Sequence, residues 1–458
     1  MTNAAVDELV AALGPAKVRT GPDIPARNRA DAAGMEPAQP LALVLPASTD
    51  DVSTALAICH RHGQPVVTQG GLTGLAGGAH PGKDEVAISL EKMVGVEEVD
   101  LSSGTLTALA GTPLQVVQQA AEAAGLMCGI DLGARGSCTI GGNVATNAGG
   151  NQVLRYGMTR KNVLGLEVVK ADGTVVRSLN KMMKNNAGYD WIQLFIGSEG
   201  TLGIVTRVTL ALHPRPVGVR SALVAVGSTS DALAVLRRLE RALPAGLLVF
   251  EAMWNEFYDI ATKTVGVAAP LERGRDLYLL IEAPMGAGGG DLFDTVLAGL
   301  YEEGLVLDAV VAKSEAERRN LWALRESVYE YDRHFGKGVA FDISIPLDRM
   351  NDAINAFRQE IPAAFAGVTW VAFGHLADSN IHLTVIPAEF TDASHHAIEE
   401  VVYSRTKALG GSVSAEHGIG RAKRPYLGLT RTPPELALMA AVKQALDPIQ
   451  ILNRGRVL

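Results

Sequence analysis

The sequence TIGGNVATNAGG at residues 139–150 contains four glycines among small polar side chains and matches the pattern of neither a helix nor a strand. A second glycine-rich stretch, QGGLTGLAGG, lies upstream at residues 69–78. Glycine allows the backbone to approach a ligand closely and to direct its N–H groups at anionic oxygens. We therefore expect the two stretches to hold one extended ligand that carries phosphate. Tight turns that merely require glycine are the alternative.

The common nucleotide motifs do not account for these glycines. Gly71, Gly74 and Gly77 have the wrong spacing for the G-x-G-x-x-G fingerprint of a dinucleotide-binding fold. The segment from Gly77 to Lys83 resembles a P-loop, but Asp84 follows where that loop needs a hydroxyl for Mg²⁺. These observations argue against a nucleotide triphosphatase.

The composition is typical of a soluble enzyme with two or three domains. The chain has 458 residues, of which 47% are hydrophobic and 20% charged, and its net charge of −8 comes without a long basic run. Nucleic acid is therefore not expected as a partner. Three cysteines without a C-x-x-C pair, and an N-terminus without a signal-peptide pattern, predict a cytoplasmic protein. No membrane span is expected, because no apolar run is long enough.

The first part of the chain, residues 1–214, is predicted to be a domain in which helices mix with short strands. The sequence PASTDD at 46–51 predicts the start of a helix with Ser48 or Thr49 as its N-cap, and Asp172 with Gly173 predicts a hairpin turn. We expect helices at 6–13, 48–62 and 112–124, and strands at 41–45, 65–68, 86–89, 106–109, 163–169, 174–176 and 204–212.

Pro214 and Pro216 mark the expected boundary to a second domain at residues 215–425, which is followed by a C-terminal segment, 426–458, that packs on the first domain. Strands are expected at 221–226, 247–252, 277–282, 339–345, 369–373 and 381–385, and helices at 230–242, 292–303, 322–331, 348–360 and 433–446. This alternation fits a parallel sheet and a ferredoxin-like layer with helices on one face equally well.

His375, His382 and Glu416 form a set of two imidazoles and one carboxylate, and His417 lies beside Glu416. The two histidines flank the polar loop in GHLADSNIH, residues 374–382, and the carboxylate lies in SAEHGIG, residues 414–420. Such a set suits Zn²⁺, Mn²⁺ or Fe²⁺ with positions left open for substrate oxygens. We therefore predict a metal site, with structural histidines as the alternative.

Arg325 lies in the helical sequence LWALRES at residues 321–327. None of its neighbours at helical spacing is acidic, so no ordinary ion pair within the helix is available to it. One interpretation is a bidentate clamp for a substrate carboxylate. The other is a solvated arginine on a helix surface.

Several blocks of the sequence resemble the vanillyl-alcohol-oxidase-type FAD-binding fold. They are the glycine-rich stretch at 69–78, the other glycine-rich stretch extended to 132–150, and RYG at 155–157, GLEVV at 165–169 and GSEGTLGI at 197–204. Within this fold, the blocks at 374–382, 411–420 and 451–453 are most similar to the D-2-hydroxyglutarate and D-lactate dehydrogenase group. The resemblance runs from about residue 41 and implies an α+β fold, in which an FAD-binding domain is followed by an α+β cap domain.

The resemblance implies FAD, its pyrophosphate along the two stretches and its isoalloxazine facing the metal site. We expect the FAD to be non-covalent, with His80 as the residue that could form a covalent link. The residues implied to contact FAD are Gly70, Gly71, Thr73, Gly74, Gly77, Gly78, Gly136, Ser137, Gly141, Gly142, Asn143, Thr146, Asn147, Gly149, Gly150, Glu199, Gly200, Gly203, Ile204 and Asn453.

The resemblance also implies oxidation of a D-2-hydroxy acid to its 2-oxo acid, with electrons passed to a quinone or an electron-transfer flavoprotein. A divalent metal, Zn or Mn, would bind His375, His382 and Glu416, and His417 would be the catalytic base. Substrate contacts are implied for Arg325, which would take the carboxylate, and for Tyr329, Asn380, Thr384 and His417. A homodimer is compatible with the chain.

Three positions depart from the hydroxyglutarate enzymes of this group. Ala340 stands where they carry a lysine, Tyr329 where they carry a threonine, and Thr384 where they carry an asparagine. Without the lysine, the second carboxylate of a dicarboxylate lacks a partner. We therefore predict a substrate with an apolar side chain, small or aromatic, with D-2-hydroxyglutarate as the alternative. Ala377 and Ser379, where the group usually has glycines, would narrow the site further.

Three other functions compete with this prediction. A metal hydrolase would use the two histidines and Glu416 with a bound water, but it leaves the glycine-rich stretches unexplained. A non-redox transferase of the same flavin fold, which makes ether-lipid precursors, and a flavin-binding protein without turnover would both explain FAD. Bleaching of a yellow protein by a hydroxy acid would exclude all three.

Overall fold

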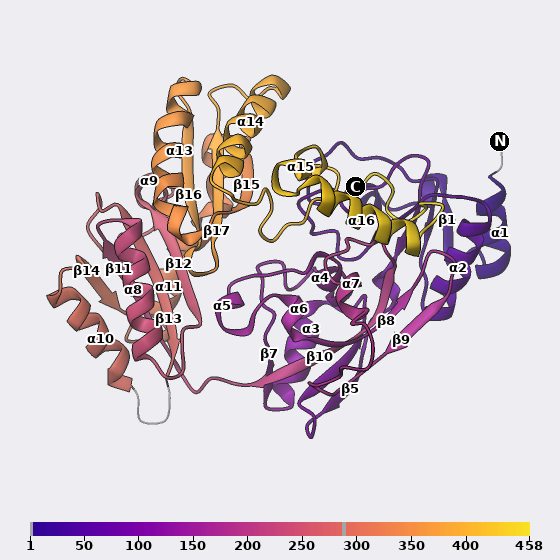
Figure 1. Ribbon diagram of the computed structural model, residues 1–458, viewed down its shortest axis with the longest axis horizontal. Coiled ribbons are helices and arrows are strands. Elements are labelled where there is room, and N and C mark those ends of the chain that lie inside the picture. The colour runs from indigo at the N-terminus through magenta and orange to yellow at the C-terminus, as the bar shows by residue number, and fades with distance from the viewer. Residues whose placement is uncertain (1–2, 286–289) are drawn as a thin grey trace. The chain divides into compact units, whose positions relative to one another are not determined.

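The computed structural model describes residues 3–285 and 290–458, and the chain divides into two compact units (Figure 1). The first unit consists of Met1–Gly150, Tyr156–Arg215 and Glu416–Leu458, and the second of Asn151–Arg155 and Pro216–Ala415. The chain thus returns to the first unit ten residues earlier than the predicted start of the C-terminal segment. Up to Ala415 it is still held by the second unit, because the Ala415 N–H donates to the Asp342 carbonyl oxygen at 3.2 Å.

The first unit contains two sheets. The four-stranded sheet has the order β1-β2-β4-β3, with β1 (Val18–Thr20) antiparallel to β2 (Ala42–Val44), and with β2 and β3 (Val66–Gln69) both parallel to β4 (Val86–Ser89). The six-stranded sheet is antiparallel and has the order β5-β6-β10-β8-β9, with β7 paired to β10. Its strands are β5 (Val96–Asp100), β6 (Thr105–Leu109), β7 (Leu126–Cys128), β8 (Val163–Val169), β9 (Val175–Ser178) and β10 (Ile204–Pro214).

The C-terminal residues extend the four-stranded sheet beyond its edge strand β3. Leu452 forms a parallel bridge with Val66. The Val66 N–H donates to the Ile451 carbonyl, and the Asn453 N–H donates to the Val66 carbonyl, each at 2.8 Å. The edge of this sheet is therefore covered by a segment from the far end of the sequence.

The helices of the first unit begin where local sequence signals place them. The Ser48 hydroxyl accepts from the Asp51 N–H at 3.2 Å and caps α2, and Thr432 and Glu435 form a capping box at the start of α16, which has its predicted bounds. The helices are α1 (Ala4–Leu13), α2 (Thr49–Arg61), α3 (Leu114–Ala123), α4 (Ile140–Thr146), α6 (Thr159–Asn162), α7 (Ile192–Phe195), α15 (Leu427–Thr430) and α16 (Pro433–Leu446). The short α5 (Val153–Tyr156) has its first three residues in the second unit and its last in the first.

The prediction that residues 139–150 form no helix is wrong for the first half of that stretch. Thr139 caps α4, and Asn147 ends the helix in the left-handed conformation with φ of 49°. Adjacent glycines lower helix propensity, so the local sequence conceals this helix. Gly141 is required by packing, because a Cβ there would lie 2.6 Å from the Cβ of Ala110. Tertiary contact therefore overrides the local preference.

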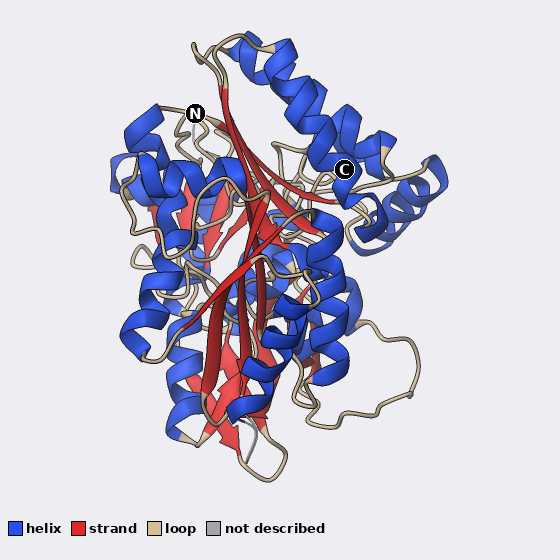
Figure 2. Ribbon diagram, turned by 90° about the vertical axis from the view of Figure 1, so that its left-hand side faces the viewer, coloured by secondary structure: helices blue, strands red, loops and turns tan. Residues whose placement is uncertain are grey.

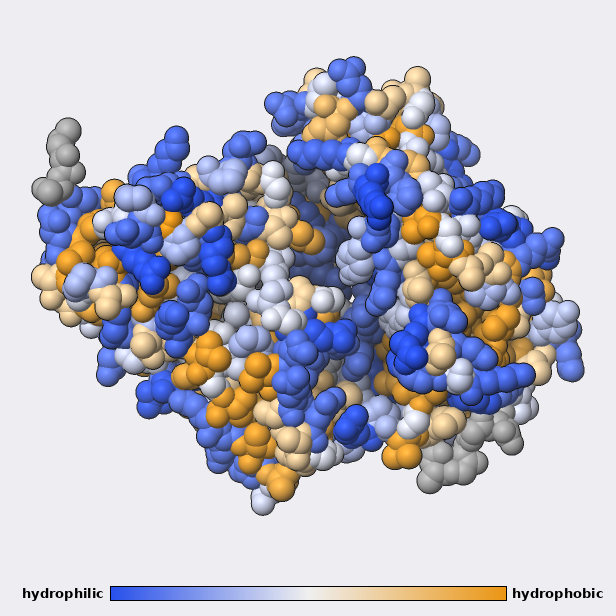
Figure 3. Space-filling view, turned by 180° about the vertical axis from the view of Figure 1, so that it is seen from behind, coloured by the Kyte–Doolittle hydropathy of each residue, from blue (hydrophilic) through white to orange (hydrophobic). Residues whose placement is uncertain are grey.

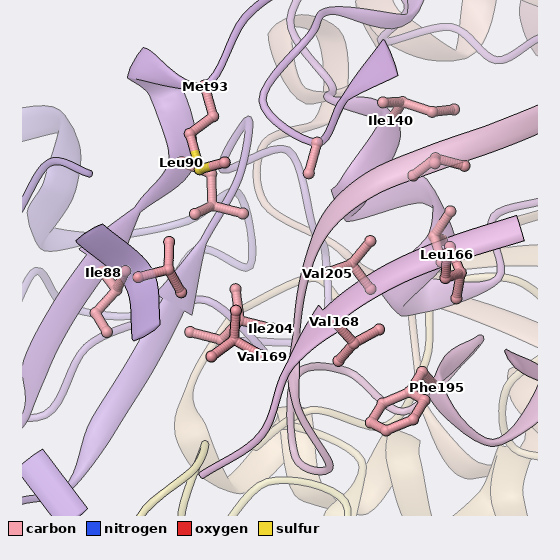
Figure 4. Close-up of a cluster of buried hydrophobic side chains, with 14 of the residues drawn as sticks. Ile88, Leu90, Met93, Ile140, Leu166, Val168, Val169, Phe195, Ile204 and Val205 are labelled. Atoms are coloured by element: carbon pink, nitrogen blue, oxygen red, sulfur yellow. The ribbon is translucent and has the colours of Figure 1, made fainter. Parts of the chain in front are cut away.

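The apolar core of the first unit holds α4 against the antiparallel sheet. Ile140 and Val144 of α4 are fully buried, and Ile140 belongs to the same core as Val168 of β8 and Val205 of β10 (Figure 4). Phe195, just before the GSEGTLGI segment, packs into the same cluster. This packing fixes α4 and the GSEGTLGI segment, residues 197–204, on one rigid base.

The second unit is built on a seven-stranded sheet of order β14-β11-β13-β12-β16-β17-β15, in which every pairing is antiparallel (Figure 2). The parallel-sheet interpretation of this region is therefore wrong. The strands are β11 (Val219–Val226), β12 (Val249–Trp254), β13 (Leu277–Pro284), β14 (Asp308–Val311), β15 (Val339–Ser344), β16 (Thr369–His375) and β17 (Asn380–Ile386).

Helices cover both faces of this sheet, unlike the one-sided layer that the sequence allowed. Met253 shares a core with Phe257 of α9 and Leu324 of α11, whereas the next residue, Trp254, donates from its indole to Thr229 of α8 at 3.2 Å. Successive strand residues point to opposite faces, so α9 and α11 lie on one face and α8 on the other. The helices are α8 (Thr229–Ala242), α9 (Asn255–Lys263), α10 (Gly290–Glu302), α11 (Glu315–Glu326), α12 (Tyr331–Phe335), α13 (Met350–Ala364) and α14 (Asp392–Ala408).

The surface is largely polar. Figure 3 shows hydrophilic residues over most of one face, with apolar residues in smaller groups among them. Within residues 3–285 and 290–458, no helix has both the length and the apolar composition needed to cross a bilayer.

Candidate cofactor and active site

A cleft of about 880 Å³, including its open mouth, lies within the first unit and is lined by both glycine-rich stretches. It brings together most residues for which the sequence predicts FAD contacts. These are Gly70, Gly71, Thr73, Gly74, Gly78, Gly141, Gly142, Asn143, Thr146, Glu199, Gly200, Gly203, Ile204 and Asn453. His417, the predicted base, lines the same cleft.

Six predicted contacts, Gly77, Gly136, Ser137, Asn147, Gly149 and Gly150, are not among the residues that line the cleft. Gly77 and Gly150 have φ of 74° and 118°, so they serve turns that favour glycine. The Asn147 side chain accepts from the Arg160 N–H at 2.8 Å. His80, considered for a covalent link, is buried and does not line the cleft either.

The cleft presents backbone rather than lysine or arginine side chains. Eight of its lining residues are glycines, and no lysine or arginine is among the described residues that line it. A Cβ at Gly71 would lie 2.1 Å from the Ser137 carbonyl oxygen, so the two stretches can approach each other only without a side chain there. A large ligand with phosphate groups fits such a cradle, because backbone N–H groups can solvate its charge.

Two side chains hold the loops of the cleft together. Asn453 donates from Nδ2 to the carbonyls of Glu199 at 2.7 Å and Gly78 at 3.3 Å, and its Oδ1 accepts from the Thr68 N–H at 2.9 Å. The Glu199 carboxylate accepts from the N–H groups of Ile419 and Gly420, each at 2.7 Å. Burial raises the pKa of Glu199, although these two hydrogen bonds oppose the shift. Glu199 thus fixes the segment that carries His417.

The predicted histidines of the second unit lie on the sheet face that α9 and α11 cover. His375 ends β16 and His382 lies in β17, with ring centroids 5.6 Å apart and rings at 77° to each other. Strand register pairs His375 with Glu251 of β12, and His382 with Phe373 of β16 and Asp342 of β15. We call this surface, defined by these five residues, the histidine face.

Glu251 is a buried carboxylate with two partners. Its Oε1 contacts Nδ1 of His375, and its Oε2 accepts from Nε of Arg325 at 2.6 Å. Burial raises the pKa of Glu251, but His375 and Arg325 lower it by more, so the pKa lies well below its usual range. The Arg325 guanidinium also lies over the Phe373 ring, 4.4 Å from its centroid. Arg325 is therefore not a solvated surface arginine.

Asp342 is the second buried carboxylate of the histidine face. Its Oδ1 lies 3.9 Å from Nδ1 of His382 and accepts from Nδ2 of Asn380 at 2.7 Å. Its backbone carbonyl accepts from Ala415, the residue that precedes Glu416. Each predicted metal-binding histidine is thus accompanied by a buried carboxylate, and the chain leading to Glu416 is anchored at the strand that supplies one of them.

The remaining predicted residues occupy diverse environments. Thr384 pairs with Ala340, two residues along β17 and β15 from the pair of His382 and Asp342. Both residues therefore lie on the same side of the sheet as the histidines. Tyr329, in the 3-10 helix Ser327–Glu330, is 74% exposed. Within the first unit, Glu416 accepts from the Gly150 N–H at 2.9 Å.

The histidine face has the donor chemistry of a metal centre. In metal sites, a ligating histidine usually donates its second ring N–H to a carboxylate or carbonyl. With Nδ1 in contact with Glu251, Nε2 is the ring nitrogen of His375 that a metal would use. Within the second unit, the residues that could hold a divalent ion are therefore these histidines.

The sequence did not identify Glu251 as a functional residue. A lone acid within the apolar strand sequence LLVFEAMW was the available signal. That signal is not specific, because Glu282 lies in the similar strand β13 and is buried against Arg318 and Trp322 of α11. The cleft also has lining residues that were not predicted, namely Thr68, Leu72, Ala76, Ala79, Leu90, Cys138, Thr139, Ala145 and Val205.

Comparisons with known proteins match both parts of the chain to families that use FAD. Residues 40–178 match the family described as FAD binding domain, and residues 215–457 match FAD linked oxidases, C-terminal domain. The mitochondrial D-2-hydroxyglutarate dehydrogenase of Bos taurus is 40% identical over 421 residues, covering 91% of this chain and 76% of that protein. The D-2-hydroxyglutarate dehydrogenase of Xanthomonas citri pv. viticola is 36% identical over 431 residues, covering 91% and 89%.

A solved alkyldihydroxyacetonephosphate synthase has the same fold. It matches with a TM-score of 0.74 at 17% identity, covering 99% of this chain and 84% of that one. At this identity the likeness concerns the fold alone. Together with the mixed helices and sheets, it confirms the predicted fold class.

Proposed function

Because the chain belongs to the FAD-dependent D-2-hydroxyacid dehydrogenases, we propose that it oxidises a D-2-hydroxy acid with an apolar side chain at a site that also holds a divalent metal. The observation that carries the proposal is the histidine face, where carboxylate-backed histidines lie beside a buried arginine and no lysine stands at position 340. Family membership sets aside the metal hydrolase, the ether-lipid transferase and the non-catalytic flavoprotein.

The proposed metal ligands are His375, His382 and Glu416. The contact between Glu251 and Nδ1 of His375 supports this assignment, because a ligating histidine usually donates the N–H of its other ring nitrogen to a carboxylate. Two nitrogens and one oxygen leave coordination positions open for substrate, as in catalytic zinc and manganese sites. A divalent ion held there would lower the pKa of the substrate hydroxyl.

The other site residues bind the substrate or accept its proton. Arg325 binds the substrate carboxylate through its terminal nitrogens, since its Nε is engaged by Glu251. Asn380, Thr384 and Tyr329 are the further substrate contacts that the resemblance implies. His417 accepts the proton of the hydroxyl, and its position in the wall of the FAD cleft supports that role. FAD, bound in the cleft of the first unit, supplies the two-electron acceptor.

The substrate preference rests on Ala340. This residue is exposed on the same side of the sheet as His382, at the position where a lysine could meet a second carboxylate. Lys337, three residues earlier, lies over the Phe390 ring at 4.6 Å from its centroid. A dicarboxylate would therefore leave one charge without a partner. D-2-hydroxyglutarate is the second candidate, because both relatives described above are named for it.

We further propose a quinone or an electron-transfer flavoprotein as electron acceptor, since a flavin that has taken up two electrons must pass them onward. A cytoplasmic location and a homodimer stay predictions from the sequence.

The experiment that tests the proposal is an anaerobic titration of the purified flavoprotein with D-lactate, D-2-hydroxyisovalerate, D-phenyllactate and D-2-hydroxyglutarate, and with their L-enantiomers. We expect the visible flavin absorbance to bleach with the D-acids only, and at the lowest concentrations with the apolar ones. A clear preference for D-2-hydroxyglutarate would overturn the apolar assignment. Bleaching that stops after chelation and returns with Zn²⁺ or Mn²⁺ is expected, and unchanged bleaching after chelation would refute the metal.

A further inference from the structure

One buried carboxylate in the second unit joins two groups that the proposed function treats separately. Glu251 lies in β12, is fully buried, and divides its two oxygens between His375 of β16 and Arg325 of α11. Each oxygen therefore has one charge-bearing or polar partner from a different element. Such contacts in a buried environment are strong, and they fix the geometry of both partners.

For His375, the contact determines which ring nitrogen carries the proton. A neutral imidazole that donates from Nδ1 to a carboxylate has its lone pair on Nε2, and only that nitrogen can then bind a metal. The carboxylate also makes the imidazole a stronger ligand. Glu251 thus sets both the tautomer and the basicity of the proposed metal ligand.

For Arg325, the contact determines which edge of the guanidinium is left for a ligand. Nε is engaged by Glu251, and the guanidinium lies over Phe373, so the group is held on two sides. The edge formed by the two terminal nitrogens is the one that matches a carboxylate in a bidentate pair. The structure gives these nitrogens no hydrogen bond to the described part of the chain.

We propose that Glu251 is a positioning residue that couples the metal ligand His375 to the substrate clamp Arg325. The inference rests on the proposed function, because it takes His375 as a ligand and Arg325 as the carboxylate contact. Its new content is that the two are not independent. A change in either contact of Glu251 alters metal affinity and substrate binding together.

The substitution Glu251→Gln makes this coupling measurable. A glutamine side chain has one accepting oxygen and one donating amide, whereas His375 Nδ1–H and Arg325 Nε–H are both donors. If the oxygen faces His375, the amide opposes Arg325, and the KM for the hydroxy acid should rise about 10-fold or more. If the oxygen faces Arg325, the amide forces the other tautomer on His375, and metal affinity should fall about 10- to 100-fold.

Glu282→Gln is the matched control. Glu282 lies in the neighbouring strand β13, is 2% exposed, and binds Arg318 and Trp322 of the same helix α11 that carries Arg325. Its substitution removes a comparable buried ion pair on the same element but touches neither His375 nor Arg325. We expect it to lower stability while leaving metal affinity and KM unchanged.

A second variant tests the coupling in the opposite direction. Arg325→Leu removes the second partner of Glu251 and adds no atom that can bind a metal. In the absence of substrate, it should bind Zn²⁺ about 3-fold or more tightly than the wild type, because the carboxylate then acts on His375 alone. In a Glu251→Gln background the same substitution should leave the affinity for Zn²⁺ unchanged.

The experiment measures Zn²⁺ affinity by competition with a chelating dye, KM and kcat for the best D-2-hydroxy acid, and the ring ¹⁵N NMR shifts of His375 in the metal-free protein. The wild type should show the Nδ1–H tautomer, and Glu251→Gln should change the tautomer or raise KM. Wild-type Zn²⁺ affinity, tautomer and KM in Glu251→Gln, or wild-type Zn²⁺ affinity in Arg325→Leu, would overturn the inference. His375→Ala separates the two proposals, since wild-type Zn²⁺ affinity in that variant would refute the metal site itself.

Discussion

The cleft of the first unit is built from backbone, whereas the histidine face of the second unit is built from buried side chains. The cleft is lined by eight glycines and, in the described chain, by no lysine or arginine. The histidine face gathers two histidines, two carboxylates and Phe373 from four strands, and an arginine from α11 packs on it. The cleft provides space for a ligand, whereas the histidine face orients ionisable side chains that are largely buried.

This difference determines how each region tolerates change. A backbone cradle fails when an added atom fills it, because its walls are already in contact. A surface of paired side chains fails when one partner is removed, because the other is then buried without compensation. Substitutions that add atoms should therefore damage the cleft, and substitutions that remove charged or polar groups should damage the histidine face.

The largest effect is expected from His382→Ala. Loss of a ligand removes several kcal/mol of charge stabilisation, so kcat/KM should fall about 1,000-fold or more. FAD content should be unchanged, because His382 belongs to the second unit and does not line the cleft. Steady-state kinetics and the visible flavin spectrum check both points. His396→Ala, an exposed histidine of α14, is the control, and loss of FAD from the His382 variant would break the comparison.

Gly71→Ala tests the cleft in the opposite way. The added Cβ would lie 2.1 Å from the Ser137 carbonyl oxygen and 2.8 Å from Cα of Cys138, so the backbone must move. We expect about 1 to 3 kcal/mol of destabilisation and loss of FAD during gel filtration. In Gly428→Ala the new Cβ meets nothing within 4 Å, so this variant should behave as the wild type. Full FAD retention in Gly71→Ala would show that the cradle is less tight than described.

Ala340→Lys should sharpen the substrate assignment. A lysine at this exposed position beside Thr384 would supply a cation for a second carboxylate. The ratio of kcat/KM for D-2-hydroxyglutarate to that for an apolar D-hydroxy acid should rise about 10- to 100-fold. Ala340→Met adds similar length without charge and should leave the ratio unaltered or lower. An unchanged ratio in the lysine variant would contradict the role of position 340.

Asn453→Gly should have the smallest effect. It removes the hydrogen bonds to Thr68, Gly78 and Glu199 while keeping the φ of 44° that glycine adopts easily. We expect a loss of about 1 to 2 kcal/mol in urea unfolding and faster release of FAD. Asn453→Ala adds backbone strain and should be less stable than the glycine variant. Equal stability of Asn453→Gly and the wild type would mean that these bonds do not hold the cleft together.

The two regions also differ in how much of each could be predicted from the sequence. Glycine-rich stretches, the Ser48 cap and the bounds of α16 depend on neighbouring residues, so the sequence alone predicted them. The helix α4 was not predicted, because its adjacent glycines have low helix propensity. Only the close packing of Gly141 against Ala110 explains why glycine stands there. α14 was not predicted although its buried Ile398 and Val402 lie one turn apart, a signal that the sequence did contain.

The histidine face was only half predictable. His375 and His382 lie seven residues apart and were identified together, but Glu251 lies far upstream and reaches His375 only through the pairing of β12 with β16. The antiparallel order of that sheet could not be chosen from alternating helices and strands. Glu282, with the same sequence signal as Glu251, contacts an arginine outside the site. Only long-range strand pairing therefore distinguishes the role of Glu251 from that of Glu282; no local sequence pattern does.

The covering of β3 by residues 451–453 has a consequence for biosynthesis. Asn453 holds Thr68 across 385 positions of the chain. At about 5 to 20 residues per second, a ribosome needs roughly 20 to 80 s to cover that distance. The glycine-rich stretches are thus made long before the segment that completes their sheet. A product interrupted before residue 451 would lack the segment that covers β3 and the Asn453 side chain that lines the cleft, so we expect it to retain less FAD than the full chain.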